Sequence, residues 1–260
     1  MTPRLITIPM SHYCEKARWG LAHAGIEFLE EAHLQVFHYR AVRRYDAHGM
    51  VPVLVTDSAA VADSTAILKH LDAQLPESRK LYPESQRAEI EALEEDFDET
   101  LGVETRRWVY FRYLDAPISE VMRTAAQGVP RWERAFAPML FPIMRMYLNR
   151  HLKITAANVE QGMRVIADGF DRVAARIGDG RRYLLGDRFT AADLTFACMA
   201  APILLPREYG IRLPALDEVP IAARSDVERF RTHPAGEFAL RLFGDDRRYL
   251  AIPPRPQSHC

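Results

Sequence analysis

The sequence lacks a strong net charge, a dense set of cysteines and any apolar run long enough to cross a membrane. Its 260 residues include 34 lysines and arginines and 35 aspartates and glutamates, which gives a formal net charge of -1. This balance gives no electrostatic reason to expect nucleic acid or a membrane as a partner. The apolar stretch from Leu194 to Leu205 is shorter than the about 20 residues that a membrane-spanning helix needs.

Cysteines are few and form no recognisable pattern. The chain has 3 of them, Cys14, Cys198 and Cys260, with no Cys-x-x-Cys pair and no cysteine–histidine spacing typical of zinc. The sequence therefore predicts neither a disulfide framework nor a metal site. Met1 to Arg4 lead directly into an apolar segment without the apolar core of a signal peptide, so we expect a cytoplasmic protein.

Strand and helix patterns alternate in the first part of the chain, in the order βαβ, short α, ββα. This order predicts an α/β thioredoxin-like domain with a mixed sheet. The expected strands cover residues 5–8, 27–34, 51–56 and 59–62, and the expected helices cover residues 12–24, 40–46 and 64–74.

Beyond a proline-bearing connector, the patterns are almost wholly helical. A capping box, Thr190 with Asp193, opens a helix that is apolar all round and is therefore expected to be buried. We predict an all-α helical bundle as the second domain. The expected boundaries are 1–78 for the first domain, 79–85 for the linker, 86–250 for the helical domain and 251–260 for a proline-rich tail.

Four short motifs follow one another along the chain. They are S-x-Y-C-x-K-x-R at 11–18, V-P-V-L at 51–54, D-S at 63–64 and L-x-G-D-x-F-T-x-A-D at 184–193. In this order and spacing they resemble the soluble glutathione S-transferases, in particular the serine-type members. The resemblance implies glutathione bound in the first domain, an electrophile in a cleft against the helical domain, and a homodimer.

The resemblance implies that Ser11 is the catalytic residue. In serine-type members the hydroxyl donates a hydrogen bond to the glutathione sulfur and is not itself the nucleophile. The sequence places Ser11 between a strand and a helix, where unpaired N–H groups and the helix dipole favour an anion. An ordinary N-cap serine would occupy the same place, and the two roles are compatible.

Cys14 and Tyr13 offer alternatives to Ser11. Cysteine-type members of the family place their reactive cysteine at the Ser11 position, and Cys14 matches the second cysteine of a glutaredoxin-like C-x-x-C. A helix-N-terminal thiol can be reactive, so a redox role for Cys14 stays open beside plain packing. Tyrosine-type members carry their tyrosine upstream of Ser11, so Tyr13 is expected to pack.

The remaining motifs imply how glutathione is held. By resemblance, a cis bond between Val51 and Pro52 lets Val51 present its backbone to the cysteinyl part of glutathione, as an added strand would. Asp63 and Ser64 open a helix, where Ser64 can bind the γ-glutamyl carboxylate and Asp63 the γ-glutamyl ammonium. Both are also common caps, and Pro52 could simply begin a strand.

The glycyl carboxylate of glutathione needs a cation or another donor. By placement, His38 is the first candidate, with Arg40 and Lys16 behind it. If His38 has this role, the affinity for glutathione is expected to fall as the imidazole deprotonates near its ordinary pKa of about 6.5.

The electrophile pocket is harder to predict. Aromatic and methionine residues recur at helical spacing, a pattern that is more typical of a core than of a ligand wall. They are Trp108, Tyr110, Phe111, Tyr113, Phe136, Met139, Phe141, Met144 and Met146. The segment 112–151 departs from a compact family member and is expected to be an insertion or a lengthened helix pair that reshapes or covers the cleft.

The leading hypothesis is a glutathione-dependent transferase that activates the glutathione thiol for attack on a small apolar electrophile. Glutathione is the cosubstrate, and no metal is expected. Two alternatives remain: a glutathione-dependent reductase or peroxidase that uses Cys14, and a non-catalytic module of the same fold that serves binding or dimerisation.

Overall fold

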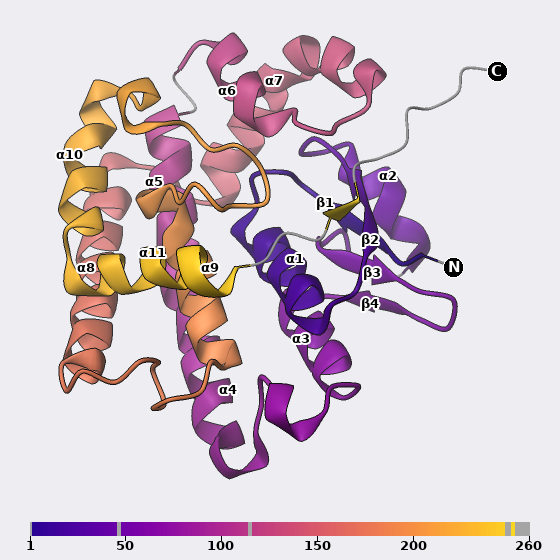
Figure 1. Cartoon of the computed structure of the whole chain (residues 1–260). Helices are drawn as coiled ribbons and strands as arrows, with labels where there is room; N and C mark the ends of the chain where they lie inside the picture. The colour runs from indigo at the N-terminus through magenta and orange to yellow at the C-terminus, as the bar shows by residue number, and fades with distance from the viewer. Residues whose placement is uncertain (1, 46–47, 114–115, 248–250, 253–260) are drawn as a thin grey trace.

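The structure is a computed structural model that describes residues 2–45, 48–113, 116–247 and 251–252. A small sheet with flanking helices is followed by a helical domain that packs against it (Figure 1). The predicted fold class, a thioredoxin-like domain followed by an all-α domain, is confirmed.

The N-terminal domain holds a mixed sheet with helices on both faces. Its strands are β1 (Arg4–Thr7), β2 (Phe28–Ala32), β3 (Val53–Val55), β4 (Ala60–Ala62) and β5 (Ala251–Ile252). Its helices are α1 (His12–Ala24), α2 (His38–Val42) and α3 (Ser64–Asp72). The strand order is β4-β3-β1-β2-β5, with β1 parallel to β2 and antiparallel to β3. Successive residues of β1 face opposite sides: Leu5 packs with α1 and α3, and Ile6 with α2.

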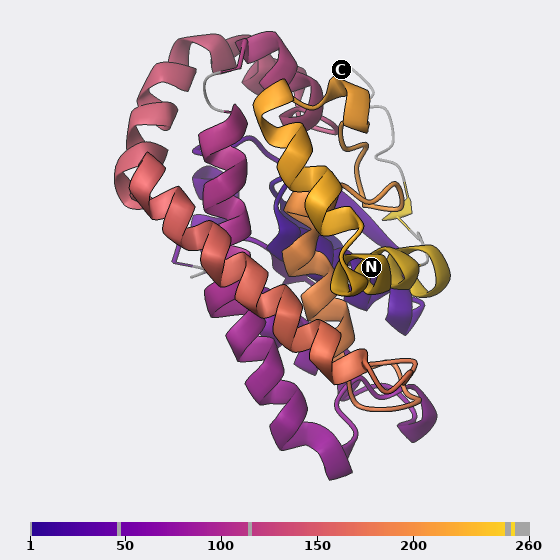
Figure 2. The same ribbon diagram turned by 90° about the vertical axis from the view of Figure 1, so that its left-hand side faces the viewer.

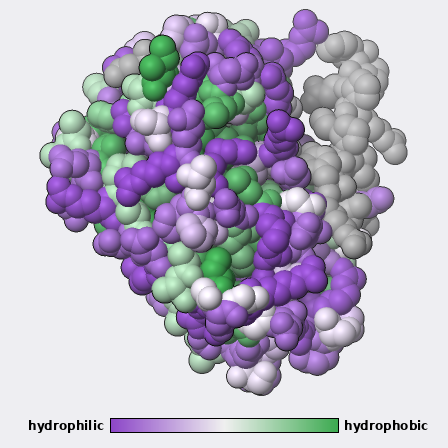
Figure 3. Space-filling view, turned by 60° about the vertical axis from the view of Figure 1, so that its left-hand side comes forward, coloured by the Kyte–Doolittle hydropathy of each residue, from purple (hydrophilic) through white to green (hydrophobic). Residues whose placement is uncertain are grey.

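The helical domain surrounds one buried helix. Its helices are α4 (Arg87–Asp96), α5 (Gly102–Tyr113), α6 (Ile118–Ala125), α7 (Arg131–His151), α8 (Ala156–Ile177), α9 (Ala191–Leu204), α10 (Ile221–Arg231) and α11 (Pro234–Asp246). A π-helical turn, Phe97–Leu101, joins α4 and α5 into one long rod beside α8 (Figure 2). The outer face of this domain is mainly hydrophilic, with scattered hydrophobic patches (Figure 3).

The capping box predicted at the start of α9 is present. The Asp193 carboxylate accepts hydrogen bonds from the Thr190 N–H at 2.9 Å, the Thr190 hydroxyl at 2.8 Å and the Leu184 N–H at 2.7 Å. These bonds satisfy N–H groups that would otherwise be left without acceptors in the core. The helix that follows is buried along almost its whole length, as its apolar sequence predicts.

Helix α1 is buried between the domains, although it carries charged residues. The Lys16 side chain is 0% exposed, and its Nζ lies 2.8 Å from Glu94 Oε1 and 2.6 Å from Asp98 Oδ2. Both carboxylates belong to the helical domain. Lys16 therefore joins the domains, and its buried, paired ammonium speaks against its place as a reserve candidate for the glycyl carboxylate of glutathione.

A second buried cation lies one half-turn further along α1. Arg18 donates to Glu30 of β2 at 2.6 Å and to the Pro9 carbonyl at 3.0 Å, and its Nη1 lies 3.2 Å from Glu15. Glu15 also accepts from Nε of Arg247 at 2.7 Å. This network ties α1 to the sheet on one side and to the end of α11 on the other.

Two connections differ from the sequence-based expectation. The connector at 79–85 is partly buried, because Leu81 and Tyr82 insert into the helical core while their N–H groups donate to Asp72. At the other end, Ala251–Ile252 pairs in parallel with β2, so these residues of the expected tail extend the sheet edge. Residues 253–260 lie outside the described part of the chain.

We predict that Lys16→Met lowers the free energy of unfolding by about 3–5 kcal/mol, because it leaves Glu94 and Asp98 without their buried cation. Lys69→Met is the control. The Lys69–Glu91 pair also joins the two domains, through α3 and α4, but it is largely exposed. This substitution should cost less than about 1 kcal/mol. Urea unfolding measures both, and equal losses would contradict the prediction.

Candidate functional site

A cavity of about 400 Å³ lies where the two domains meet. One wall comes from the β1–α1 loop, α2, the loop before β3 and the start of α3, and the other from α5, α7 and α9. The lining includes every residue for which the sequence predicted the catalytic or a glutathione-binding role in the leading hypothesis: Ser11, His38, Val51, Pro52, Asp63 and Ser64. Four separate segments thus converge on one space.

Ser11 is the N-cap of α1 and lies half-buried in the cavity wall. Its Oγ accepts a hydrogen bond from the Cys14 N–H at 3.4 Å. A serine hydroxyl has one proton and two lone pairs, so capping leaves the proton to donate elsewhere. The first N–H groups of α1 lack intrahelical acceptors, and the positive end of the helix dipole lies here. Ser11 can therefore cap the helix and donate a hydrogen bond to an anion at the same time.

The Tyr13 hydroxyl is already used as a donor. It bonds to the Asp98 carbonyl in the π-helical turn at 2.8 Å, and burial raises its pKa to about 12. This close approach of α1 and α5 needs Gly102, where a Cβ would lie 2.8 Å from the Tyr13 hydroxyl and 2.5 Å from Met199 Sδ. Tyr13 thus supports the wall of the cavity, in line with its expected packing role.

Cys14 points into the protein interior. Its side chain is 0% exposed and does not line the cavity. Burial raises the pKa of its thiol to about 11, although Arg18 and the Ser11 hydroxyl favour the thiolate. The helix N-terminus that can activate a thiol is therefore outweighed by desolvation at this position.

The loop before β3 has the geometry that the sequence predicted. The Val51–Pro52 peptide bond is cis. Pro52 is buried, and its carbonyl accepts from the Asp63 N–H at 3.2 Å, which ties the loop to the start of α3. Val51 is half-buried at the cavity wall, so its backbone is placed to pair with an extended ligand.

The start of α3 forms a second helix N-terminus at the cavity. Asp63 is its N-cap, with Oδ1 accepting from the Ala66 N–H at 3.0 Å, and Ser64 is the first, buried residue. Asp63 has a φ of 80°, a conformation that is strained for a residue other than glycine. The exposed Asp63 carboxylate lies beside the cavity, where it can meet a cation.

His38 lines the cavity as an uncharged group. Its Nε2 hydrogen-bonds to the Gly49 carbonyl at 3.0 Å, so this nitrogen carries the proton. Burial lowers the pKa of His38 below its ordinary value. Nδ1 is buried and has no partner among the described residues. Arg40, the next candidate for the glycyl carboxylate, is exposed and does not line the cavity.

The helical domain adds polar residues that the sequence analysis did not assign to the site. Arg106 and Tyr110 come from α5, and Tyr147 and His151 come from α7. The Tyr147 ring lies 4.0 Å from the His151 ring, and its hydroxyl is 3.5 Å from that of Tyr39 on α2. The i, i+4 spacing of Arg106 and Tyr110 was the available signal, because it puts both on one helix face.

A small apolar extension of about 60 Å³ adjoins this cavity. Val109, Tyr110 and Leu148 line both spaces, and Phe141 and Met144 line the extension alone. The expectation that the aromatic and methionine residues form a core is wrong for much of α7. Its exposed face carries Phe136 at 52%, Met139 at 66% and Met146 at 68% exposure, because no described element packs over it.

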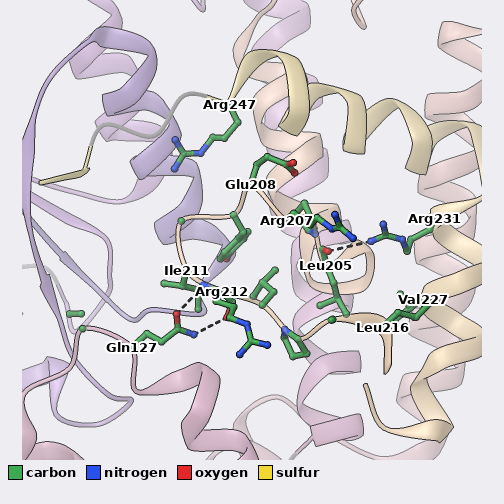
Figure 4. Close-up of a pocket in the computed structure, with 18 of the residues that line it drawn as sticks. Gln127, Leu205, Arg207, Glu208, Ile211, Arg212, Leu216, Val227, Arg231 and Arg247 are labelled. Atoms are coloured by element: carbon green, nitrogen blue, oxygen red, sulfur yellow. Dashed lines mark hydrogen bonds between the residues drawn. The ribbon is translucent and has the colours of Figure 1, made fainter. Parts of the chain in front are cut away.

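A larger cavity of about 1020 Å³ lies under the loop between α9 and α10 (Figure 4). Several of its polar groups are already paired within the protein. Gln127 exchanges hydrogen bonds with the Arg212 backbone, and Arg231 donates to the Leu205 carbonyl. It contains none of the residues that the sequence predicted for a site. The smaller cavity is therefore the candidate site.

The described residues contain no cluster of three or more histidine, cysteine, aspartate or glutamate side chains placed to hold a metal ion. In the same part of the chain, no helix is long and apolar enough to cross a bilayer.

Fold and cavity together define a two-domain protein with a ligand cleft between a thioredoxin-like and a helical domain. The glutathione S-transferase N-terminal domain model matches residues 5–79, and the C-terminal domain model matches residues 156–231. Both matches follow the order of the fold and together cover more than half of the chain. The chain therefore belongs to the glutathione S-transferase superfamily. Comparison with curated proteins gave no match.

Solved structures share this fold at low sequence identity. A glutathione S-transferase of Ceriporiopsis subvermispora in complex with glutathione is 16% identical, with a TM-score of 0.66 and coverage of 95% of this chain and 98% of the other. The transferase GSTFuA3 of Phanerochaete chrysosporium is 18% identical, with a TM-score of 0.65 and coverage of 97% and 99%. A glutathione S-transferase of Rhodospirillum rubrum is 22% identical, with a TM-score of 0.57 and coverage of 97% and 96%.

We predict that Cys14 resists alkylation in the native protein. With a pKa raised from 9.0 to about 11, its thiolate is about a hundredfold scarcer at pH 8, and burial also blocks access. Iodoacetamide labelling followed by peptide mass spectrometry, with and without urea, measures this. The buried Cys198 is the internal control. Equal labelling of Cys14 in both conditions would contradict the burial described here.

Proposed function

We propose that the protein is a serine-type glutathione transferase that activates the glutathione thiol for attack on a small, largely apolar electrophile. The observation that carries this proposal is the convergence of Ser11, the Val51–Pro52 loop and the start of α3 on one cavity. Two helix N-termini, and the Ser11 hydroxyl whose proton is not used in capping, offer binding sites for the anionic groups of the tripeptide.

The proposed catalytic step depends on the thiolate. The Ser11 proton is not used in capping, so the hydroxyl can donate to the glutathione sulfur. The dipole of α1 acts on the same atom, and together they lower the pKa of the bound thiol. The thiolate then attacks the electrophile, which the cavity holds beside it.

Binding of the tripeptide would use the other cavity walls. The Val51 backbone pairs with the cysteinyl residue, Ser64 and the N–H groups of α3 hold the γ-glutamyl carboxylate, and the Asp63 carboxylate holds the γ-glutamyl ammonium. His38 does not suit the glycyl carboxylate in this tautomer, because its Nε2–H donates to the Gly49 carbonyl and its Nδ1 can only accept a hydrogen bond.

Burial and a raised thiol pKa argue against the reductase alternative that uses Cys14. The non-catalytic alternative remains distinguishable by experiment, since it requires no change in the glutathione thiol. We further propose a cytoplasmic homodimer, in keeping with the family resemblance. Light scattering of the purified protein tests the dimer, and fractionation of expressing cells tests the location.

We predict that bound glutathione has a thiol pKa below its free value and that Ser11→Ala raises it by about one to two pH units, because a hydrogen bond to a charged group is lost. Thiolate absorbance measured across pH reports this pKa. Ser11→Thr keeps both the cap and the donor and should restore the low value.

Ser58→Ala, in the exposed β3–β4 turn, controls for loss of a serine hydroxyl elsewhere. Glutathione bound with an unchanged thiol pKa in the wild type would favour the non-catalytic module. Absence of glutathione binding would overturn the proposed function.

We predict that Asp63→Asn weakens glutathione binding by about 1 kcal/mol, or about fivefold, since an exposed charge pair with the γ-glutamyl ammonium is lost. Asparagine still caps a helix and tolerates positive φ, so the melting temperature should change little. Calorimetric titration with glutathione and with its desamino analogue measures this. The analogue lacks the ammonium, and an equal loss for both ligands would contradict the role of Asp63.

A further inference from the structure

Arg106 stands apart from the other arginines of α5. Arg107 is paired with Glu104 and donates to the Leu152 carbonyl at 2.9 Å, and Arg112 lies 2.7 Å from Asp226. Arg106 has no ion pair with any described residue, and its Nε is buried without a hydrogen-bond partner. The Arg106 side chain is half-buried, and a partly desolvated cation is stabilised by an anion that pairs with it.

The position of Arg106 directs this charge toward a ligand. Its guanidinium carbon lies 5.8 Å from the centre of the Tyr13 ring, and its side chain lines the candidate site. Asp98, which also acts on Tyr13, forms its ion pair with Lys16 instead: its Oδ2 lies 2.6 Å from Lys16 Nζ and accepts from the Thr65 hydroxyl at 3.1 Å. Asp63 is the carboxylate that lines the same cavity, and it forms no ion pair with Arg106, so the guanidinium has no direct counter-charge among the described residues.

One turn further along α5, the wall becomes apolar. Tyr110 lies at i+4 from Arg106 and lines both the main cavity and its extension. Met122, Phe141 and Met144 are among the residues that line the extension. A molecule that spans both spaces would thus meet a cation at one end and aromatic and methionine side chains at the other.

We propose that the acceptor of this transferase carries a carboxylate, or a similar single anionic group, that pairs with Arg106 while its aromatic or aliphatic body lies in the main cavity against the apolar extension. This inference rests on the proposed function and refines its substrate class. The γ-glutamyl carboxylate has its own proposed partner at α3, and Arg106 lies one helical turn from the apolar extension that Tyr110 lines, so we assign Arg106 to the second substrate. A planar guanidinium is suited to two parallel hydrogen bonds with a carboxylate.

Two acceptors that differ only in charge test this inference: 4-chloro-3-nitrobenzoate and 4-chloro-3-nitrobenzamide. In both, the glutathione thiolate forms a carbon–sulfur bond, the carbon–chlorine bond breaks, and chloride and the thiol proton are released. Each value of kcat/KM is divided by the rate of the uncatalysed reaction to remove the difference in intrinsic reactivity.

The wild type should favour the benzoate by about tenfold or more, mainly through KM. Arg106→Gln should abolish this preference while leaving the KM for glutathione unchanged, and Arg106→Lys should restore part of it. Arg164→Gln, which removes an arginine from an exposed pair on α8, should keep the preference. Circular dichroism confirms that each variant is folded.

Binding of unreactive analogues separates this inference from the proposed function. Calorimetry with 3-nitrobenzoate and 3-nitrobenzamide, with and without S-methylglutathione, should show tighter, Arg106-dependent binding of the benzoate. That result without glutathione binding would uphold the anion site and overturn the transferase. Equal binding of both analogues to the wild type would overturn the anion site. The anion site would also be overturned if Arg106→Gln weakened glutathione binding but kept the preference for the benzoate.

Discussion

The arrangement of the two domains depends on charges buried in α1. Lys16 and Arg18 are both 0% exposed, and each reaches carboxylates from elsewhere in the fold. A complete buried ion pair adds little net stability over an apolar pair, but loss of one partner leaves the other charge uncompensated, so the two partners must stay together. The same helix carries Ser11 at its N-terminus. The ion pairs therefore fix the helical domain relative to the residue proposed to meet the thiol.

The π-helical turn extends this constraint to the opposite wall of the site. Asp98 lies in that turn, where its carboxylate binds Lys16 and its carbonyl accepts from Tyr13. Gly102 follows and allows α5 to approach α1 closely. One turn later, α5 places Arg106 at the cavity. The buried charges of α1 thus help to fix the position of Arg106. Among the described residues, Arg106 is the one arginine or lysine that lines the cavity, and it has no ion pair.

Local signals in the sequence were sufficient for the N-terminal half of the site. Ser11, Asp63 and Ser64 are cap residues of helices, and Val51–Pro52 is a local backbone feature, so short motifs could locate them. The sequence could name Lys16 as a reserve candidate behind His38 because its actual partners lie about 80 residues away, on α4 and the π-helical turn. Burial of that kind is a tertiary property. The periodicity of α7 likewise shows two apolar faces without showing which one the protein covers.

The expected positive charge on His38 is a further prediction that burial reverses. The sequence suggested that His38 could bind a carboxylate as a cation and lose this role near pH 6.5. Burial lowers the pKa of His38 and lowers that of His12, also at the cavity, to about 3. A group whose pKa is lowered is already neutral near pH 6.5 and changes little above it. Recognition of an anion in this cavity therefore follows the Arg106 guanidinium rather than either histidine.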